Sequence, residues 1–291
     1  MKFGAIDIGS NAVRLQIVRV NENTNDLDVY KKLEFIRVPI RLGDDAFKHK
    51  KISKEKRKIF MKSMAAFKLV MDAFGVDYYM ACATSAMREA KNGQKIVDKV
   101  YDKYNLKINI ISGVRESEII LNSIKTYFKP EQNYLTIDVG GGSTEMTVIV
   151  KGKPVNSVSF DIGTVRMVDG AVKEKTWQTI EHWVKHKTAE IPNLEAVVTS
   201  GTINKISNML NPADPEYFTR KQLKDFHRKV SKMSIEERMD QLKLNPDRAD
   251  IIDISADIYL RILNWCNIET IHAPNAGLKD GMLNELYEKY Y

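Results

Sequence analysis

The same short pattern occurs twice in this chain, and this repeat limits the possible folds more than any other feature. Residues 3–20 read FGAIDIGSNAVRLQIVRV, and residues 134–150 read YLTIDVGGGSTEMTVIV. Superposing the two copies aligns their apolar flanks and three central pairs of positions: Asp7 with Asp138, Gly9 with Gly140, and Arg14 with Glu145. The copies lie 131 residues apart, a spacing that is too long for a solenoid repeat and suits two duplicated halves.

Length and composition agree with two globular domains. The chain has 291 residues, of which 43% are hydrophobic and 29% are charged, as in ordinary soluble domains. The N-terminal sequence MKFGAIDIGS has no apolar core long enough for a secretory signal, and no run of about 18 apolar residues follows it. We therefore expect a cytoplasmic protein with no membrane partner.

The charge balance favours anionic partners. The net charge is +7 and the pI is about 9.1, which suits polyphosphate, nucleotides, nucleic acid or lipid surfaces. The densest basic run, KHKKISKEKRK at residues 48–58, is typical of a solvated face where a helix starts. Nucleic acid is an unlikely partner, because net charge alone suggests it and no aromatic and basic recognition module is present.

The cysteines and histidines give weak signals. Cys82 and Cys266 lie in apolar stretches and are too few for a disulfide framework or a zinc site. Cys82 and Arg88 match the C-x5-R pattern of cysteine-dependent phosphatases, but an apolar strand does not favour a reactive thiolate. His182 and His186 can share a helix face, yet no third ligand is near them, so we expect no metal there.

Hydrophobic periodicity predicts the same order of elements in both halves. In the first half, apolar positions at helical spacing predict a helix that starts after Ser53 and stops at Gly75. Predicted strands occupy residues 3–9, 12–20, 27–38, 76–83, 106–111, 134–139, 144–151, 154–161, 194–200 and 270–273. Other predicted helices occupy residues 95–104 and 115–127, a segment that ends near 190, and most of the chain from 203. This order indicates two mixed α/β domains that face each other across a cleft.

Each copy of the repeat has the features of a phosphate-binding loop. After the strand that ends at Asp138, glycines let backbone N–H groups approach a ligand closely, and hydroxyl groups add donors. The predicted donors are Gly140, Gly141, Gly142, Ser143 and Thr144 in the second copy. The first copy offers the corresponding groups with fewer glycines: Asp7, Gly9, Ser10 and Asn11. Asp138 suits a hydrated Mg²⁺ that bridges to the phosphate.

These features resemble the actin-like ATPase superfamily, and the details resemble one branch, the Ppx/GppA family of exopolyphosphatases and guanosine pentaphosphate phosphohydrolases. Eight segments carry the likeness in the family's order: AIDIGSNAVRL, ACATSAMREAKN, ISGVRESEI, IDVGGGSTE, SFDIGTVRMVD, TSGTINKI, NPDRADII and AGLKDGML. The resemblance implies two duplicated actin-like ATPase (ribonuclease H-like) domains that flank an interdomain cleft, in the short form of the family. We place these domains at residues 1–126 and 127–291, with a helix at about 276–291 that can pack back onto the first.

The resemblance also implies roles for individual residues. The family's water-activating glutamate matches Glu116, and the altered segment around it leaves Glu118 as an alternative. Glu145 matches a residue that helps to hold the metal or the attacking water. The implied Mg²⁺ ligands are Asp7, Asp138 and Glu145, and the implied substrate contacts beyond the loops are Arg14, Thr84, Ser85, Arg88 and Arg248. Gly201 and Thr202 match the loop that binds adenosine in actin-like ATPases.

We therefore expect a Mg²⁺-dependent phosphohydrolase that releases the terminal phosphate of polyphosphate, or the 5′ γ-phosphate of guanosine pentaphosphate, by direct attack of water. One alternative is a kinase or ATPase of the same superfamily, which would need a nucleoside pocket around Gly201. Another is a sensor that binds polyphosphate or guanosine tetraphosphate without turnover. Members of the resembling family often form dimers, so a homodimer is also an expectation.

Overall fold

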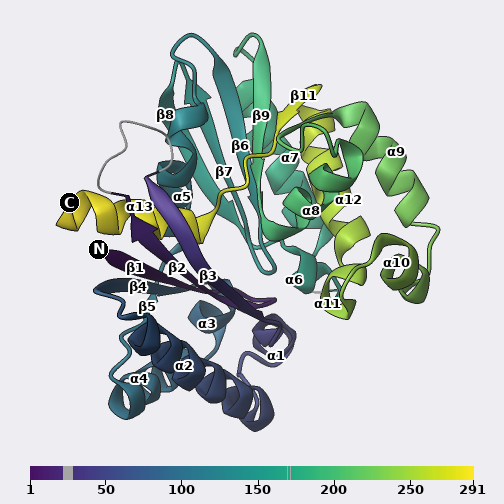
Figure 1. Cartoon of the computed structure of the whole chain (residues 1–291). Helices are drawn as coiled ribbons and strands as arrows, with labels where there is room; N and C mark the ends of the chain where they lie inside the picture. Colours follow the sequence, from purple (N-terminus) through teal and green to yellow (C-terminus); the bar gives the residue numbers. More distant parts are fainter. Residues whose placement is uncertain (22–28, 169, 171) are drawn as a thin grey trace. The chain divides into compact units, whose positions relative to one another are not determined.

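The structure, a computed structural model, describes residues 1–21, 29–168, 170 and 172–291, and these form two compact units. The first unit comprises Met1–Ser123 and Leu278–Tyr291, and the second comprises Ile124–Gly277. Each unit contains one β-sheet with helices packed against it (Figure 1). Within the described ranges, none of the helices combines the length and the apolar character that crossing a membrane requires.

The elements of the two units follow each other in similar order. The first unit contains β1 (Lys2–Ile8), β2 (Val13–Val20), β3 (Tyr30–Val38), α1 (Leu42–His49), α2 (Lys54–Phe74), β4 (Tyr78–Ala83), α3 (Ser85–Glu89), α4 (Gly93–Tyr104), β5 (Asn109–Ile110), α5 (Gly113–Ile124) and α13 (Leu278–Tyr290). The second contains η1 (Lys125–Tyr127), β6 (Asn133–Val139), β7 (Thr144–Val150), β8 (Lys153–Phe160), α6 (Thr164–Val168), α7 (Glu174–Thr188), β9 (Leu194–Thr199), α8 (Gly201–Leu210), β10 (Tyr217–Thr219), α9 (Arg220–Val230), α10 (Ile235–Leu242), α11 (Pro246–Ala249), α12 (Ile252–Trp265) and β11 (Thr270–His272).

The two sheets share one topology. The strand order is β3-β2-β1-β4-β5 in the first sheet and β8-β7-β6-β9-β11 in the second, which adds β10 at its edge. In both sheets the first three strands are antiparallel and the next two run parallel to the first strand of the hairpin. The fold-class prediction of two duplicated α/β domains is therefore confirmed.

The sheet register reproduces the alignment of the two sequence copies. Asp7 lies opposite Arg14 in the β1–β2 pair, and Asp138 lies opposite Glu145 in the β6–β7 pair. Residues directly opposite each other on antiparallel strands point to the same face and have neighbouring side chains. In each hairpin, the acidic residue of the first strand, Asp7 or Asp138, therefore lies beside the aligned position of the second strand, which is Arg14 or Glu145.

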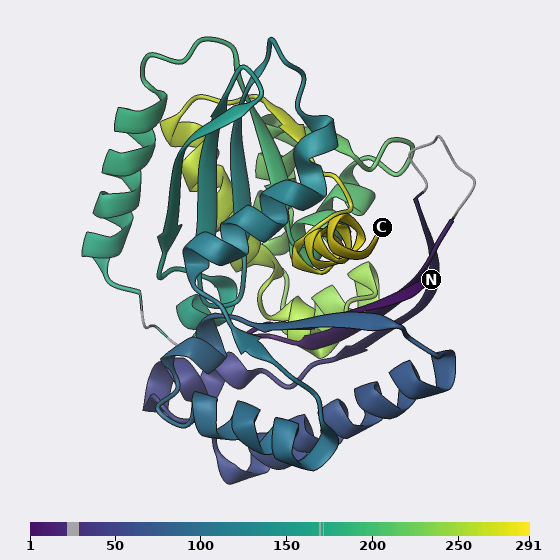
Figure 2. The same cartoon turned by 90° about the vertical axis from the view of Figure 1, so that its left-hand side faces the viewer.

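Helices cover both faces of the first sheet, as the alternation along β1 requires. Gly4 faces α2, where a Cβ would lie 3.0 Å from the Met71 sulfur. Phe3 and Ala5 point to the other face and pack in a cluster with residues of α5 and α13, including Met282. The α2 and α4 helices thus lie on one side of the sheet, and α5 and α13 lie on the other (Figure 1, Figure 2).

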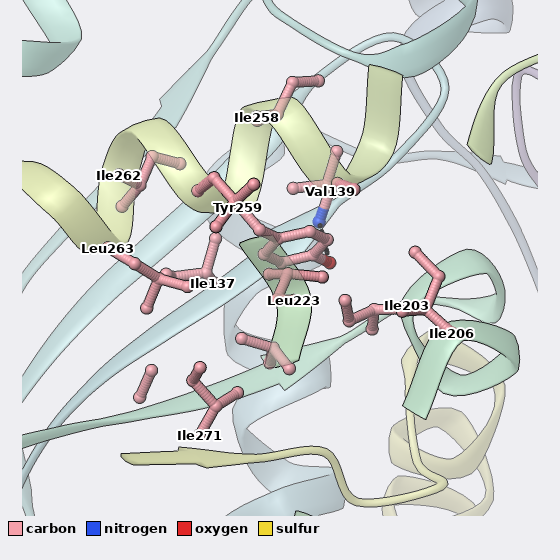
Figure 3. Packing of buried hydrophobic residues seen from close by; sticks show 14 of the residues in the cluster. Ile137, Val139, Ile203, Ile206, Leu223, Ile258, Tyr259, Ile262, Leu263 and Ile271 are labelled. Carbon is pink, nitrogen blue, oxygen red and sulfur yellow. Dashed lines mark hydrogen bonds between the residues drawn. The ribbon is translucent and has the colours of Figure 1, made fainter. Parts of the chain in front are cut away.

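The core of the second unit surrounds Tyr259, whose ring is completely buried among residues of α8, α9, α12 and the sheet (Figure 3). Its hydroxyl donates to the Thr199 carbonyl (2.6 Å) and accepts from the Val139 N–H (3.2 Å). Burial raises the pKa of Tyr259 far above its usual value, and nearby Asp138 adds to the effect. The neutral hydroxyl therefore ties together the ends of β6 and β9, where candidate site residues lie.

Some elements differ from the sequence predictions. The helix from Lys54 to Phe74 is confirmed, with the Ser53 hydroxyl accepting from the Lys56 N–H (3.3 Å) and Gly75 in a left-handed conformation. Three short elements, α1, α3 and β10, were not predicted, and α1 and α3 lack a side-chain N-cap hydrogen bond that could mark their start. The β5 strand is shorter than predicted, since only Asn109 and Ile110 pair with β4. Positions 27 and 28 of the predicted third strand lie outside the described residues.

Candidate functional site

The loop between β1 and β2 is held through its carbonyl groups. The Ser10 carbonyl accepts from the Gly43 N–H (2.9 Å), and the Asn11 carbonyl accepts from the Arg41 N–H (2.8 Å). In a trans peptide, the carbonyl and the N–H of the next residue point in opposite directions. The N–H groups of Asn11 and Ala12 are therefore turned away from the start of α1 and are oriented as donors.

Hydroxyl groups connect this loop to the turn after β4. The Ser10 and Ser85 hydroxyl oxygens are 2.8 Å apart, and the Ser10 oxygen also accepts from the Ala86 N–H (3.2 Å). Thr84 and Ser85 are buried, and Arg88 follows one turn later on α3. The structure thus brings together four residues that the sequence analysis assigned to substrate binding: Ser10, Thr84, Ser85 and Arg88.

The α5 helix separates its two candidate glutamates. Glu116 is 8% exposed, and its carboxylate lies 3.9 Å from the guanidinium of Arg88, which also donates to the Ile111 carbonyl (2.8 Å). The Glu118 side chain is 57% exposed and pairs with Arg115 (3.2 Å). Residues two apart on a helix point to nearly opposite sides. The geometry therefore favours Glu116 over Glu118 as the site carboxylate.

Asp7 and Arg14, next to the loop of the first hairpin, form an ion pair with each other. A guanidinium nitrogen of Arg14 lies 2.5 Å from a carboxylate oxygen of Asp7, as their opposite positions in the sheet allow. Asp7 was predicted to bind Mg²⁺ and Arg14 to bind phosphate oxygens. In the structure the two side chains bind each other, and their roles toward metal and substrate stay predictions.

The glycine loop of the second unit is also fixed through its carbonyl groups. Its three carbonyls accept hydrogen bonds as follows: Gly140 from the Thr164 N–H (3.0 Å), Gly141 from the N–H groups of Val165 (2.9 Å) and Arg166 (3.0 Å), and Gly142 from the Arg166 side-chain Nε (2.8 Å). The N–H groups of the following residues, Gly141, Gly142 and Ser143, are therefore turned away from α6. Three successive N–H groups that point to one side form a suitable cradle for phosphate oxygens.

Thr144, the last residue of this predicted loop, is completely buried. Its hydroxyl donates to the Ile162 carbonyl (2.8 Å). In the structure this side chain therefore supports the hairpin.

Two carboxylates, Asp138 and Glu145, lie side by side next to the loop of the second hairpin. The Thr199 hydroxyl donates to Asp138, and the Ser159 hydroxyl donates to Glu145 (2.7 Å), which is only 3% exposed. Like charges directly opposite each other on two strands are destabilising, and a cation beside them would offset that repulsion. Two carboxylates suit Mg²⁺, which usually takes one or two protein carboxylates and completes its shell with water and substrate phosphates.

Two carboxylates do not by themselves complete the coordination of a metal ion. No cluster of three or more His, Cys, Asp or Glu side chains that could hold a metal occurs in the part of the chain that the structure describes. These residues therefore suit a Mg²⁺ ion whose other ligands are water and the phosphate of a substrate. They do not suit a closed site in which every ligand comes from the protein.

The remaining predicted residues of the second unit lie on separate helices. Gly201 and Thr202 begin α8, where the Ser200 hydroxyl accepts from the Ile203 N–H (3.2 Å) as an N-cap. Arg248 is half-buried on the short helix α11. These residues are not part of the glycine loop, and their contact with a substrate stays a prediction.

Sequence reasoning missed the residues that hold the site in place. Arg166 is buried and reaches the glycine loop with its side chain, while Thr199 and Ser159 orient the two carboxylates. The only available signal for Arg166 was its place in the segment SFDIGTVRMVD. Ser159 and Thr199 begin the segments SFDIGTVRMVD and TSGTINKI, but their contacts with the carboxylates depend on the pairing of strands that are distant in sequence.

The C-x5-R alternative is not supported by the environment of its thiol. Cys82 lies opposite Asp7 in the β1–β4 pair and is 0% exposed. Burial raises the pKa of Cys82 to about 12, and the negative charges of Asp7 and Glu285 add to this effect. Below that pH the group is a neutral thiol, and a neutral thiol is not the nucleophile of such phosphatases.

We expect the variant Cys82→Ser to match the native protein in an assay of the phosphate release that the sequence analysis predicts, because a buried neutral thiol is not a nucleophile. Iodoacetamide at neutral pH should leave Cys82 of the folded protein unmodified, as read by peptide mass spectrometry. Rapid alkylation of Cys82 with parallel loss of activity would restore the cysteine-dependent mechanism.

Comparisons with known proteins agree with these observations. Residues 22–290 match the model of the Ppx/GppA phosphatase family. Two relatives are the bifunctional 3-dehydroquinate synthase/phosphatase of Fusobacterium nucleatum, 27% identical with 90% of this chain and 43% of that protein aligned, and exopolyphosphatase 1 of Mycobacterium leprae, 22% identical with 97% and 88% aligned. The chain therefore spans less than half of the first relative and most of the second.

A solved structure shares the fold over the full chain. The crystal structure of an exopolyphosphatase from Cytophaga hutchinsonii superposes with a TM-score of 0.86 at 20% identity, covering 100% of this chain and 99% of the other. At this level of identity the likeness establishes the fold, and it leaves the chemistry to be argued from the residues.

Proposed function

This chain belongs to the Ppx/GppA phosphatase family, and we propose that it is a Mg²⁺-dependent phosphohydrolase. Its proposed reaction releases the terminal phosphate of inorganic polyphosphate or the 5′ γ-phosphate of guanosine pentaphosphate by direct attack of water. The observation that carries this proposal is the buried carboxylate of Glu116 beside the guanidinium of Arg88. A carboxylate within reach of water and a cation that can contact phosphate oxygens are the groups that hydrolysis of a phosphoanhydride needs.

The proton transfer is assigned to the first unit. Glu116 accepts a proton from the attacking water as the new oxygen–phosphorus bond forms, and Arg88 attracts the negative charge on the phosphoryl oxygens. The bridging P–O bond to the rest of the substrate breaks in the same step, and the shortened chain or guanosine tetraphosphate leaves as an anion with the electron pair of that bond. The transition state of such a transfer is loose and spreads charge over those oxygens. The N–H groups of Asn11 and Ala12, with the Ser10 hydroxyl, are further donors for that charge. No covalent bond between enzyme and phosphorus is required.

The second unit offers further groups for binding the substrate and the metal. The N–H groups of Gly141, Gly142 and Ser143 would bind phosphate oxygens, since they point to one side of the loop. Asp138 and Glu145 would hold Mg²⁺, which when bound neutralises part of the negative charge of a phosphate chain. Arg166 keeps the glycine loop in this orientation, so it positions the donors without touching the substrate.

The proposal is tested by measuring phosphate release from long-chain polyphosphate, guanosine pentaphosphate and ATP side by side. We expect release from at least one of the first two, loss of this activity with excess EDTA, and recovery when Mg²⁺ is restored. Transfer of phosphate from ATP to an acceptor would favour a kinase instead. Tight binding of polyphosphate without any turnover would favour the sensor alternative.

A further inference from the structure

A basic pocket on the first unit is not used by the proposed reaction. It has a volume of about 280 Å³ and lies between the first turns of α2 and α4, which run side by side (Figure 1, Figure 2). Among the described residues that line it, five have cationic side chains and none has an acidic one. The five cations are Lys54, Arg57, Lys58, Lys95 and Lys99. We call this site the basic pocket.

Within the described part of the chain, the cations of the basic pocket have no ion-pair partners, although their neighbours do. In the same basic run, Lys56 pairs with Asp44 (2.9 Å) and Lys50 pairs with Glu89 (2.9 Å). None of the five lining cations forms an ion pair with any residue of the described ranges. The Nε atom of Arg57 is buried and has no hydrogen-bond partner there either. The pocket therefore gathers positive charge that the protein itself does not neutralise.

The helix ends increase this positive charge. The N-terminus of a helix carries a partial positive charge, so cations in the first turn are unfavourable. Lys54 and Arg57 occupy the first turn of α2, and Lys95 occupies the first turn of α4. Mutual repulsion among the lysines adds to the cost. An anion bound in the pocket would relieve both effects.

The pocket is fixed in shape and joined to the catalytic region of the first unit. The Asn92 side chain donates to the Ile52 carbonyl (2.8 Å) and accepts from the Ile52 N–H (2.9 Å), which ties α4 to the segment before α2. Gly93 packs so closely on the Met87 carbonyl that a Cβ there would overlap it. The start of α4 thus rests on α3, which carries Arg88. An anion in the pocket would therefore lie beside the element that presents Arg88.

The lining indicates which polyanion fits. The non-cationic residues are Met61, Ile96 and Asn92, so no aromatic side chain is available to stack a nucleic-acid base. Polyphosphate carries a charge on every phosphorus and has no sugar or base between its charges. It can therefore bring several charges into a pocket of this volume, whereas RNA or DNA brings bulky groups with each phosphate.

We propose that the basic pocket binds an internal segment of inorganic polyphosphate and thereby increases the affinity of the protein for long chains. This inference rests on the proposed function only for the choice of polyphosphate as the substrate. The interaction would weaken as the salt concentration rises, since the lining lysines are exposed and their charges are screened.

The test compares two triple variants of equal charge. The first, Lys58→Gln with Lys95→Gln and Lys99→Gln, removes three cations from the pocket. The control, Lys221→Gln with Lys224→Gln and Lys229→Gln, removes three exposed lysines of α9 in the second unit. Lysine and glutamine have similar helix propensities, so both variants should fold. Each is assayed for binding of long-chain polyphosphate, by fluorescence anisotropy, and for phosphate release from long-chain polyphosphate and from tripolyphosphate.

We expect the pocket variant to bind long chains about tenfold more weakly or worse, to raise KM for long chains, and to leave kinetics on tripolyphosphate unchanged. The control should match the native protein. Equal binding of long chains by both variants would overturn the inference, as would single-stranded RNA that competes for the pocket as well as polyphosphate does. Weaker binding by the pocket variant in a protein that releases no phosphate would support the pocket and contradict only the proposed function.

Discussion

Replacing Glu116 by Gln is expected to lower the rate of phosphate release by about 10²- to 10⁴-fold, the usual contribution of a general base. The amide keeps the size of the carboxylate but cannot accept the proton of the attacking water. Because Glu116 is already beside Arg88, the amide should still fit the site, and polyphosphate should still bind. The measurements are kcat for phosphate release and the Kd for long-chain polyphosphate.

Glu118→Gln is the matched control for this variant. The two glutamates lie on the same helix, but the Glu118 side chain is exposed and pairs with Arg115. Exposed ion pairs contribute little to stability, so we expect this variant to keep near-native activity and stability. If Glu116→Gln retained activity and Glu118→Gln lost it, the assignment of the base would have to be reversed.

Gly163→Ala is expected to reduce kcat/KM by about 10²-fold, through a displacement of the glycine loop. A Cβ at this position would lie 2.5 Å from the Gly141 carbonyl carbon and 2.5 Å from the Gly142 nitrogen. These contacts are with backbone, so the loop must move to accept the methyl group. Its N–H groups would then lose the orientation that the carbonyl hydrogen bonds impose. Phosphate release and thermal unfolding should both be measured.

Gly277→Ala is the control for the same chemical change, because no described residue beyond its two chain neighbours has an atom within 4 Å of a Cβ there. It should leave both measurements unchanged. Native kcat/KM in Gly163→Ala would show that the close approach of Gly163 to the loop is irrelevant to catalysis. The Tm of Gly163→Ala shows whether a loss of activity comes from unfolding, which lowers the Tm, or from a local displacement of the loop.

The sequence supports the architecture better than it supports the site. Strand alternation and strand-terminal acids are local signals, so the strands of both hairpins and their equivalence could be predicted from the alignment of Asp7 with Asp138, whereas the register within each hairpin comes from the structure. The choice between Glu116 and Glu118 was left open, because it depends on the rotation of α5 against the sheet. The pairing of Asp7 with Arg14 was also missed, since a loop motif does not show which side chain its neighbour on the next strand contacts.

Long-range packing explains the other omissions. Arg166 reaches the glycine loop because the start of α6 is hydrogen-bonded to the carbonyl groups of that loop. The sequence of the segment SFDIGTVRMVD does not reveal this contact. The basic run at residues 48–58 looked like a uniform solvated face. In the structure Lys56 turns to Asp44 and Asp45, whereas Lys54 and Lys58 line a pocket with α4. Contacts with two other helices, α1 for Lys56 and α4 for Lys54 and Lys58, decide that division.

The most direct test of the central claim is phosphate release in water labelled with heavy oxygen, followed by mass spectrometry of the inorganic phosphate. Direct attack of water on the terminal phosphorus predicts that each phosphate released from polyphosphate or guanosine pentaphosphate carries one labelled oxygen from the first turnover. Phosphate that appears without label, a phosphoryl group that appears on an acceptor or on the protein, or no release at all would contradict a phosphohydrolase that uses water directly.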